Sequence, residues 1–278
     1  MSRHIAGAMT AAIRGVTGVM TKWQGIATRA QIAADLVPRV KVATKHGDLS
    51  FYTPSKTAVY WPRRGMGTEP DTLRWLDRMA PGSVLWDIGA SVGIYSLYAA
   101  ARGDMEVLAF EANPYTYHCL LQNTRENRLD GKLKPYCVAL AETASLGSLY
   151  LDSVEAGTVG NAFGDPANSL LRTSAGTIDV PMVSLSIDAL AGAFGAAFPT
   201  HIKIDVDSIE EQIVAGGAKT LCDPRVKSVL MELHRDINQP DGRSAAIVER
   251  MRSYGFSIDE SDSGGSVNCL FVRPEPRA

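Results

Sequence analysis

The chain has 278 residues, of which 45% are hydrophobic and 21% charged, with a formal net charge of -2. This composition is ordinary for a globular protein, and the length predicts one large domain with room for an appended segment. The near-neutral balance argues against the strong basic footprint of a nucleic-acid-binding protein, so small molecules are the expected substrates.

Cysteine usage and hydropathy indicate the cellular compartment. The four cysteines are far apart in the sequence and none belongs to a CxxC pair, so we expect reduced, mostly buried thiols and neither a zinc site nor a disulfide framework. The sequence has no apolar run of bilayer-spanning length and nothing that resembles a signal peptide. We therefore expect a cytoplasmic protein.

Residues 1–45 differ in composition from the rest, being basic and rich in Ala, Gly, Thr and Met. Apolar side chains recur there at steps of three and four residues, which predicts an amphipathic helix or helix pair. They are Ile5, Met9, Ile13, Val16, Met20, Trp23 and Ile26. We interpret this extension as packing on the main domain or on a second subunit of a homo-oligomer. Peripheral contact with a membrane surface is the alternative.

Residues 46–278 alternate between apolar strands and helical stretches. The expected strands are residues 83–89, 106–112, 133–140, 201–207, 227–234, 256–261 and 267–274. Helical segments at 93–103, 115–128 and 209–221 separate several of them, and a hairpin-like turn joins the last two strands. This predicts an α/β, Rossmann-like fold with a mostly parallel seven-stranded sheet and an antiparallel C-terminal hairpin. The long connection at residues 151–180 is expected to be either a substrate-side cover or a surface insertion.

The strand that ends at Asp87 runs through a glycine turn into a helix, in the pattern DxGxxxG. Gly89 and Gly93 allow the backbone to approach a ligand closely, although such turns are also common structural features. Asp87 suits a cationic group such as the ammonium of a methionyl moiety, whereas a dinucleotide favours GxGxxG. A nicotinamide dehydrogenase is therefore disfavoured.

The next apolar strand ends at Glu111, a position from which a carboxylate accepts hydrogen bonds from both ribose hydroxyls in Rossmann-type domains. Ala139 and Leu140, at the end of the third strand, are candidates to lie against an adenine, although such residues are usually core. The full set of predicted cofactor-binding residues is Asp87, Gly89, Ser91, Gly93, Glu111, Ala112, Asn113, Ala139 and Leu140.

Short segments spread over residues 66–235 resemble the FkbM family of class I methyltransferases. They include VLWDIGASVGIYSLYAA, FEANPYTY, IKIDVDSIEEQIVAGGAKTL and VLMELH, in the family's order. The resemblance implies S-adenosylmethionine as the methyl donor and transfer to an oxygen, often a hydroxyl of a sugar, glycan or polyketide.

Three positions depart from the family's pattern, which usually has Asn where this chain has Ser91 and Glu-Gly where it has Asp207-Ser208. Ser91 keeps a polar group that can reach the cofactor's carboxylate. Asp207 is shorter than Glu, so the departure affects the expected substrate geometry more than cofactor binding. A catalytically weak S-adenosylmethionine-binding module therefore remains an alternative.

Methyl transfer to a hydroxyl requires alignment of donor and acceptor and uptake of the hydroxyl proton. His234 is the expected general base, and Asp205 is expected to orient a substrate group or to serve as the base instead. The segment IDVD also resembles the strand that holds magnesium in catechol-type O-methyltransferases, but the sequence offers no further ligand at a suitable spacing. We predict no metal and keep a metal-dependent enzyme as an alternative.

Overall fold

The computed structural model describes residues 2–165, 177–207, 209–233, 242–259 and 268–274. The chain divides into two compact units, Met1–Arg39 and Val40–Ala278, and each is described by itself. Among the helices within the described ranges, none combines the length and the apolar character needed to cross a membrane.

The N-terminal unit is a pair of helices, α1 (Ser2–Gly18) and α2 (Lys22–Asp35). They meet closely, because a β-carbon at Gly25 would lie 2.5 Å from the carbonyl oxygen of Thr17. The guanidinium of Arg29 donates a hydrogen bond to the buried Thr17 hydroxyl at 2.8 Å. The expected helix pair is therefore present, but six side chains of its predicted apolar face are exposed, namely Ile5, Met9, Val16, Met20, Trp23 and Ile26.

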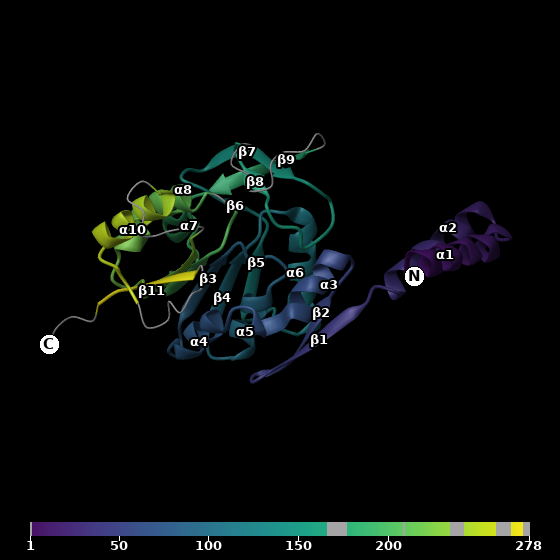
Figure 1. Cartoon of the computed structure of the whole chain (residues 1–278), viewed down its shortest axis with the longest axis horizontal. Coiled ribbons are helices and arrows are strands. Elements are labelled where there is room, and N and C mark those ends of the chain that lie inside the picture. Colours follow the sequence, from purple (N-terminus) through teal and green to yellow (C-terminus); the bar gives the residue numbers. More distant parts are fainter. Residues whose placement is uncertain (1, 166–176, 208, 234–241, 260–267, 275–278) are drawn as a thin grey trace. The chain divides into compact units, whose positions relative to one another are not determined.

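The second unit is built on a seven-stranded sheet of the order β12-β13-β11-β10-β3-β4-β5 (Figure 1). Its strands are β3 (Val84–Ile88), β4 (Glu106–Phe110), β5 (Leu133–Tyr136), β10 (His201–Ile204), β11 (Ser228–Glu232), β12 (Ser257–Ile258) and β13 (Asn268–Val272). β13 is antiparallel to both β11 and β12, and the neighbouring pairs in the run β11-β10-β3-β4-β5 are parallel. The predicted Rossmann-like sheet with its C-terminal hairpin is confirmed.

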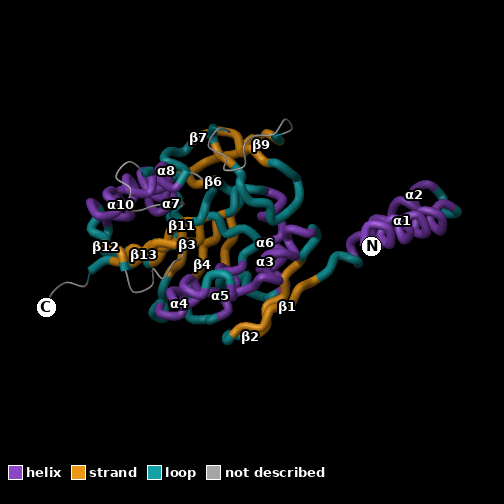
Figure 2. Tube along the Cα trace, viewed as in Figure 1, coloured by secondary structure: helices purple, strands orange, loops and turns teal. Residues whose placement is uncertain are grey.

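Helices cover both faces of this sheet (Figure 2). One buried cluster joins the sheet to α4 (Pro70–Arg78), α5 (Ile94–Ala101) and α6 (Pro114–Glu126). The other joins it to α7 (Ile187–Gly192), α8 (Glu210–Ala215), α9 (Ala218–Cys222) and α10 (Arg243–Ser253). Two short elements, α3 (Lys56–Arg64) and η1 (Gly65–Gly67), precede α4. Strands buried on both faces explain the nearly continuous apolar runs of the sequence.

A second sheet has the strand order β6-β9-β7-β8. Its strands are β6 (Ala139–Leu140), β7 (Ser145–Leu151), β8 (Ala162–Phe163) and β9 (Ile178–Leu185). The single strand expected at 133–140 is therefore wrong, because the chain leaves the main sheet after β5 and enters the second sheet at β6. The predicted long connection contributes β8 and the start of β9, and its residues 166–176 lie outside the described part.

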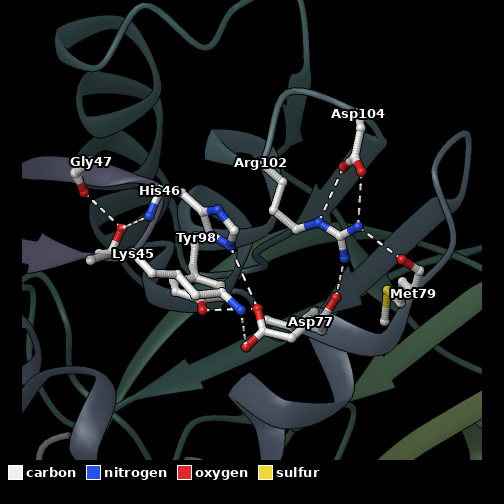
Figure 3. A network of polar contacts seen from close by, with 10 residues as sticks. Lys45, His46, Gly47, Asp77, Met79, Tyr98, Arg102 and Asp104 are labelled. Carbon is white, nitrogen blue, oxygen red and sulfur yellow. Dashed lines mark hydrogen bonds and ion pairs between the residues drawn. The ribbon is translucent and has the colours of Figure 1, made fainter.

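A two-stranded sheet, β1 (Arg39–Thr44) and β2 (Gly47–Tyr52), joins the main body through a polar network (Figure 3). Its β-turn supplies Lys45, which pairs with Asp77 of α4 at 2.5 Å. The hydroxyl of Tyr98 in α5 donates to the same carboxylate at 2.9 Å. Arg102 donates to the backbone carbonyls of Leu76 and Met79. The network thus fixes α4 against α5 and the β1–β2 turn.

The cysteine prediction is half correct. All four thiols are free, and Cys119 and Cys269 are buried as expected. Cys137 and Cys222 are exposed instead. Cys137 follows β5 where the chain leaves the main sheet, and Cys222 is the last residue of α9, so both lie at element ends and not within the core.

Candidate functional site

A cavity of about 390 Å³ opens at the carboxyl ends of β3, β4, β10 and β11. Ligands of open α/β sheets bind at this edge, and the volume falls within the range of small-molecule pockets. Its walls come from the residues that directly follow these strands, from the β5–β6 connection, and from segments around α3 and β8.

Asp87 occupies the penultimate position of β3 and its side chain is completely buried at the cavity. One carboxylate oxygen accepts a hydrogen bond from the hydroxyl of Ser96. The other, Oδ1, has no hydrogen-bond partner among the residues that the structure describes. Burial raises the pKa of Asp87, and the ammonium of Lys203 opposes that rise. A buried carboxylate with an unused acceptor facing a cavity is well placed for a cationic ligand group.

The turn after β3 brings backbone to the cavity surface. Gly89 has a φ of 83° and Ser91 a φ of 51°, both in the left-handed region. Ser91 lines the cavity, and within the described part of the chain its buried hydroxyl has no hydrogen-bond partner. Gly93 also has a positive φ, but it lies against the side chains of Leu97 and Leu120 and is absent from the cavity wall. Its predicted cofactor contact is therefore not supported, and its position explains the glycine as a packing requirement.

Glu111 follows β4 and lies buried in the cavity wall. Its Oε2 accepts the Ser91 N–H and its Oε1 the Asn113 N–H, each at 2.8 Å. Burial raises the pKa of Glu111 to about 7, although these two hydrogen bonds oppose the rise. The carboxylate therefore ties the β3 turn to the β4 turn and keeps acceptor capacity toward the cavity, since two oxygens offer about four lone-pair sites.

Asn113 caps α6, with its side-chain oxygen accepting the N–H of Tyr115 at 3.0 Å and of Thr116 at 3.4 Å. The side-chain oxygen of Asn113 is therefore used as a helix N-cap, which is the role expected of an asparagine before a proline in the first turn of a helix. Ala112, Ala139 and Leu140 line the cavity as the sequence predicted. All predicted cofactor-binding residues except Gly93 therefore meet at one cavity.

The end of the cavity at β10 and β11 is rich in ionisable groups. Lys203 is buried and forms an ion pair with Asp205, and its ammonium lies 5.1 Å from the ring centre of Tyr95. Burial would lower the pKa of Lys203, but the carboxylates of Asp205 and Asp87 outweigh it and hold that pKa above its ordinary value. Lys203 therefore keeps its positive charge in the cavity wall, whereas the sequence predicted only that it belongs to the strand at 201–207.

Glu232, the last residue of β11, also lines this end and shares a hydrogen bond with Asp205. Burial and this hydrogen bond raise the pKa of Glu232 to about 8. Glu69, before α4, adds another carboxylate, which accepts hydrogen bonds from Thr72 and Asn268. The strand-end position of Glu232 indicates this placement in the sequence, whereas Glu69 has no periodic or spacing signal.

The segment between β7 and β8 contributes Thr158, Val159 and Asn161 to the cavity wall. It is fastened by the indole of Trp61, which donates to the carbonyl of Gly157 at 2.8 Å, and by Gly160, whose N–H donates to Asp207. Part of the predicted cover therefore lines the cavity, held by α3 on one side and by the end of β10 on the other.

His234, the predicted general base, lies outside the described residues, so its role stays a prediction. Asp205 is present in the wall. Within the described ranges, His, Cys, Asp and Glu side chains form no group of three or more that could hold a metal ion.

The donors and acceptors of the cavity match the methyl donor that the sequence implies. The unpartnered oxygens of Asp87 and Ser91 and the carboxylate of Glu111 line the same cavity, and the backbone at Gly89 approaches it without a side chain. These groups suit an ammonium, a carboxylate and ribose hydroxyls in polarity. The residues therefore fit S-adenosylmethionine.

Comparison with known proteins gives a consistent result. The model of the methyltransferase FkbM domain matches residues 87–258. The 31-O-demethyl-FK506 methyltransferase FkbM of Streptomyces tacrolimicus is 27% identical over 218 residues, which cover 70% of this chain and 80% of that protein. A tRNA (guanine(37)-N(1))-methyltransferase of Coprinopsis cinerea is 37% identical over 81 residues, but these cover 29% of this chain and 17% of that protein.

Among solved structures, a SAM-dependent methyltransferase from Agrobacterium tumefaciens matches with a TM-score of 0.47 and 9% identity, covering 86% of this chain and 71% of that one. A magnesium protoporphyrin IX methyltransferase from Synechocystis with bound SAM matches with a TM-score of 0.44 and 13% identity, covering 74% of this chain and 78% of that one.

Proposed function

Because the chain belongs to the FkbM methyltransferase family, we propose that it transfers the methyl group of S-adenosylmethionine to a hydroxyl oxygen of a sugar, glycan or polyketide-like small molecule. The observation that carries this proposal is the cavity, in which Asp87 and Glu111 line one part of the wall and Asp205 and Glu232 another. The similarity to a relative named as an O-demethyl-FK506 methyltransferase supports oxygen as the atom methylated.

The chain's own residues divide into two groups in this proposal. Asp87 accepts a hydrogen bond from the methionyl ammonium, Ser91 binds the methionyl carboxylate, and Glu111 accepts hydrogen bonds from the ribose hydroxyls. Ala139 and Leu140 lie against the adenine. When bound, S-adenosylmethionine supplies an electrophilic methyl group on a sulfonium.

The remaining residues align the acceptor and take up its proton. Asp205 faces the cavity with its side chain 29% exposed, and the buried Lys203 holds it by an ion pair. A carboxylate held at the cavity wall in this way is our candidate for the general base, which must lie within reach of the hydroxyl. His234 is the other candidate for proton uptake.

Two measurements test the proposal. Calorimetry should show binding of S-adenosylhomocysteine, and NADH should not compete. Mass spectrometry should then detect a gain of one methyl group when the protein is incubated with S-adenosylmethionine and a panel of methyl glycosides, oligosaccharides and hydroxylated macrolides. Parallel reactions with EDTA or with added Mg²⁺ test for a metal requirement.

The outcomes separate the alternatives. Methylation of a panel hydroxyl supports the proposal. Tight binding of S-adenosylhomocysteine without methylation of any panel compound contradicts the proposed acceptor class and favours a binding module. Binding of NADH in preference to S-adenosylhomocysteine contradicts the cofactor assignment. Loss of activity in EDTA, restored by Mg²⁺, favours the metal-dependent alternative.

A further inference from the structure

The carboxyl groups of Asp205 and Glu232 lie at the end of the cavity that β10 and β11 form, where we place the methyl acceptor. β10 and β11 are parallel with Ile204 opposite Met231, so the residues that follow, Asp205 and Glu232, are neighbours at the same sheet edge. Both line the cavity, and they share a hydrogen bond. An ionised carboxylate has no donor, so two carboxyl groups that are neighbours at a sheet edge can hydrogen-bond to each other only when one of them holds a proton.

The surroundings decide which group holds the proton. The buried ammonium of Lys203 forms its ion pair with Asp205 and therefore favours the ionised form of that side chain. Burial, the hydrogen bond to Asp205 and the charge of Asp205 raise the pKa of Glu232, against a weaker opposing effect of Lys203. Glu232 is consequently the donor and Asp205 the acceptor at neutral pH.

We infer that Asp205 and Glu232 form one proton-sharing pair that takes up the proton of the acceptor hydroxyl, which makes Glu232 a catalytic residue. This inference rests on the proposed function and names the base within it. The pair carries one negative charge, which faces the buried ammonium of Lys203 and can be neutralised by one proton.

The acceptor oxygen forms its bond to the methyl carbon while the carbon–sulfur bond breaks and leaves its electron pair on sulfur. The hydroxyl proton passes to Asp205, so both carboxyl groups are then neutral. The extra proton leaves to solvent, and the pair returns to a single negative charge with Glu232 donating to Asp205.

The first experiment detects the shared proton without any acceptor. The full chain, labelled with ¹³C at the glutamate carboxyl carbons, is titrated by NMR with and without S-adenosylhomocysteine. We expect one carboxyl signal to titrate near pH 8, to disappear in Glu232→Gln and to move to lower pH in Asp205→Asn. The matched control Glu106→Gln changes a β4 glutamate outside the cavity, which pairs with Lys134, and should leave the signal unchanged.

The second experiment measures turnover with the acceptor that the panel identifies. Asp205→Asn should lower kcat by about 100-fold or more, the scale for loss of a general base. Glu232→Gln still donates to Asp205 but cannot titrate, so it should retain more activity and lose the inflection near pH 8 in the pH profile of kcat. Both variants should bind S-adenosylhomocysteine within twofold of the parent chain, and Glu106→Gln should match the parent throughout.

Failure of this inference is distinguishable from failure of the proposed function. A titration in which the signal that disappears in Glu232→Gln ionises below about pH 6 overturns the pair whatever the acceptor is. A shared proton combined with unchanged kcat and pH profile in both variants overturns its catalytic role. Absence of methylation of every panel compound by the parent chain contradicts the proposed acceptor class, while the NMR titration still decides whether the pair exists.

Discussion

A β-carbon at Gly89 would lie 1.8 Å from the carbonyl oxygen of Asp205, so the β3 turn and the end of β10 are in direct backbone contact. The Asp205 N–H donates to the carbonyl of Ile88 at 2.9 Å, and the Gly89 N–H donates to Phe110 at 2.9 Å. The same backbone contacts between the ends of β3, β4 and β10 therefore position both the turn after β3 and Asp205, the proposed base.

Gly89→Ala is expected to destabilise the protein and to abolish cofactor binding. The residue must keep a φ of 83°, and the added carbon has no space beside Asp205. The loss in unfolding free energy should be about 2 to 4 kcal/mol, combining left-handed strain with overpacking. Urea denaturation and calorimetry with S-adenosylhomocysteine measure the two effects.

Gly103→Ala is the matched control, because Gly103 has a φ of 80° and a β-carbon added there would meet no atom within 4 Å beyond its chain neighbours. It should cost about 1 kcal/mol from backbone strain and leave S-adenosylhomocysteine affinity intact. Equal losses in the two variants would show that contact with Asp205 has no energetic role.

The affinity for S-adenosylhomocysteine should rise with pH through neutrality because of Glu111. Burial raises the pKa of this carboxyl to about 7, and the charges of Asp207 and Asp87 add to the rise. Ribose hydroxyls donate to the ionised form, so protonation competes with binding. Affinity should be about tenfold weaker at pH 6 than at pH 8 and should level off above pH 8.

Binding of S-adenosylhomocysteine near pH 7 should release a proton from Glu111. Calorimetry detects this release as a binding enthalpy that depends on the ionisation heat of the buffer. Glu111→Gln should remove the pH dependence, and Glu111→Ala should weaken binding by about 1 to 3 kcal/mol. A flat affinity between pH 6 and pH 8 in the parent chain would exclude Glu111 from contact with the ribose. Folding stability of the ligand-free protein should change with pH in the opposite direction to ligand affinity. The pKa of Glu111 is higher in the folded than in the unfolded chain, so its contribution to stability is lost as pH increases from about 4.5 to 7.

The sheet and the cofactor half of the site could be predicted from the sequence because both depend on local patterns. Continuous apolar runs identify buried parallel strands, and Asp87 and Glu111 are the last polar residues of such runs. Gly93 shows the limit of this reasoning. Its glycine is required by the side chains of Leu97 and Leu120, a tertiary contact that the motif does not reveal.

The rest of the site depends on contacts between segments far apart in the chain. Glu69 reaches the cavity from before α4, and Trp61 reaches it from α3, so neither has a signal in its own neighbourhood. The second sheet was missed for the same reason. β7 pairs with β9 across a long connection, and this pairing between distant segments is not visible in the sequence of either strand alone.

Asp207→Ala is expected to speed the dissociation of S-adenosylhomocysteine. Asp207 accepts the N–H of Gly160 and so holds the segment that contributes Thr158 and Asn161 to the cavity wall. Loss of a charged hydrogen bond of about 1 kcal/mol should raise the dissociation rate several-fold. Stopped-flow fluorescence measures it, with Trp61 in the wall as the intrinsic reporter.

Asp152→Ala is the control for this change, since Asp152 is an exposed aspartate just after β7. S-adenosylhomocysteine should dissociate from Asp152→Ala at the same rate as from the parent chain. If Asp207→Ala also leaves the rate unchanged, the hydrogen bond to Gly160 does not retain the ligand, and the segment is held by Trp61 and its other contacts.

Asp77→Asn should destabilise the fold without affecting the site, because the network in Figure 3 fixes α4 against α5 and the β1–β2 turn. Burial raises the pKa of Asp77, but hydrogen bonds from Lys45 and Tyr98 outweigh it, so the net shift is downward. The carboxylate therefore contributes stability above its unfolded pKa, and this contribution is lost as pH falls through the lower folded value.

The expected loss for Asp77→Asn is about 1 to 2 kcal/mol at pH 7, shrinking below about pH 4, with S-adenosylhomocysteine affinity unchanged. Asp71→Asn is the comparison, because Asp71 pairs with Arg74 one helical turn away on the same helix and should cost about 0.5 kcal/mol or less. Urea denaturation from pH 3 to pH 8 measures both. A loss for Asp77→Asn that is equally large at pH 3 and pH 7 would mean that packing of the side chain, and not its charge, holds the two helices.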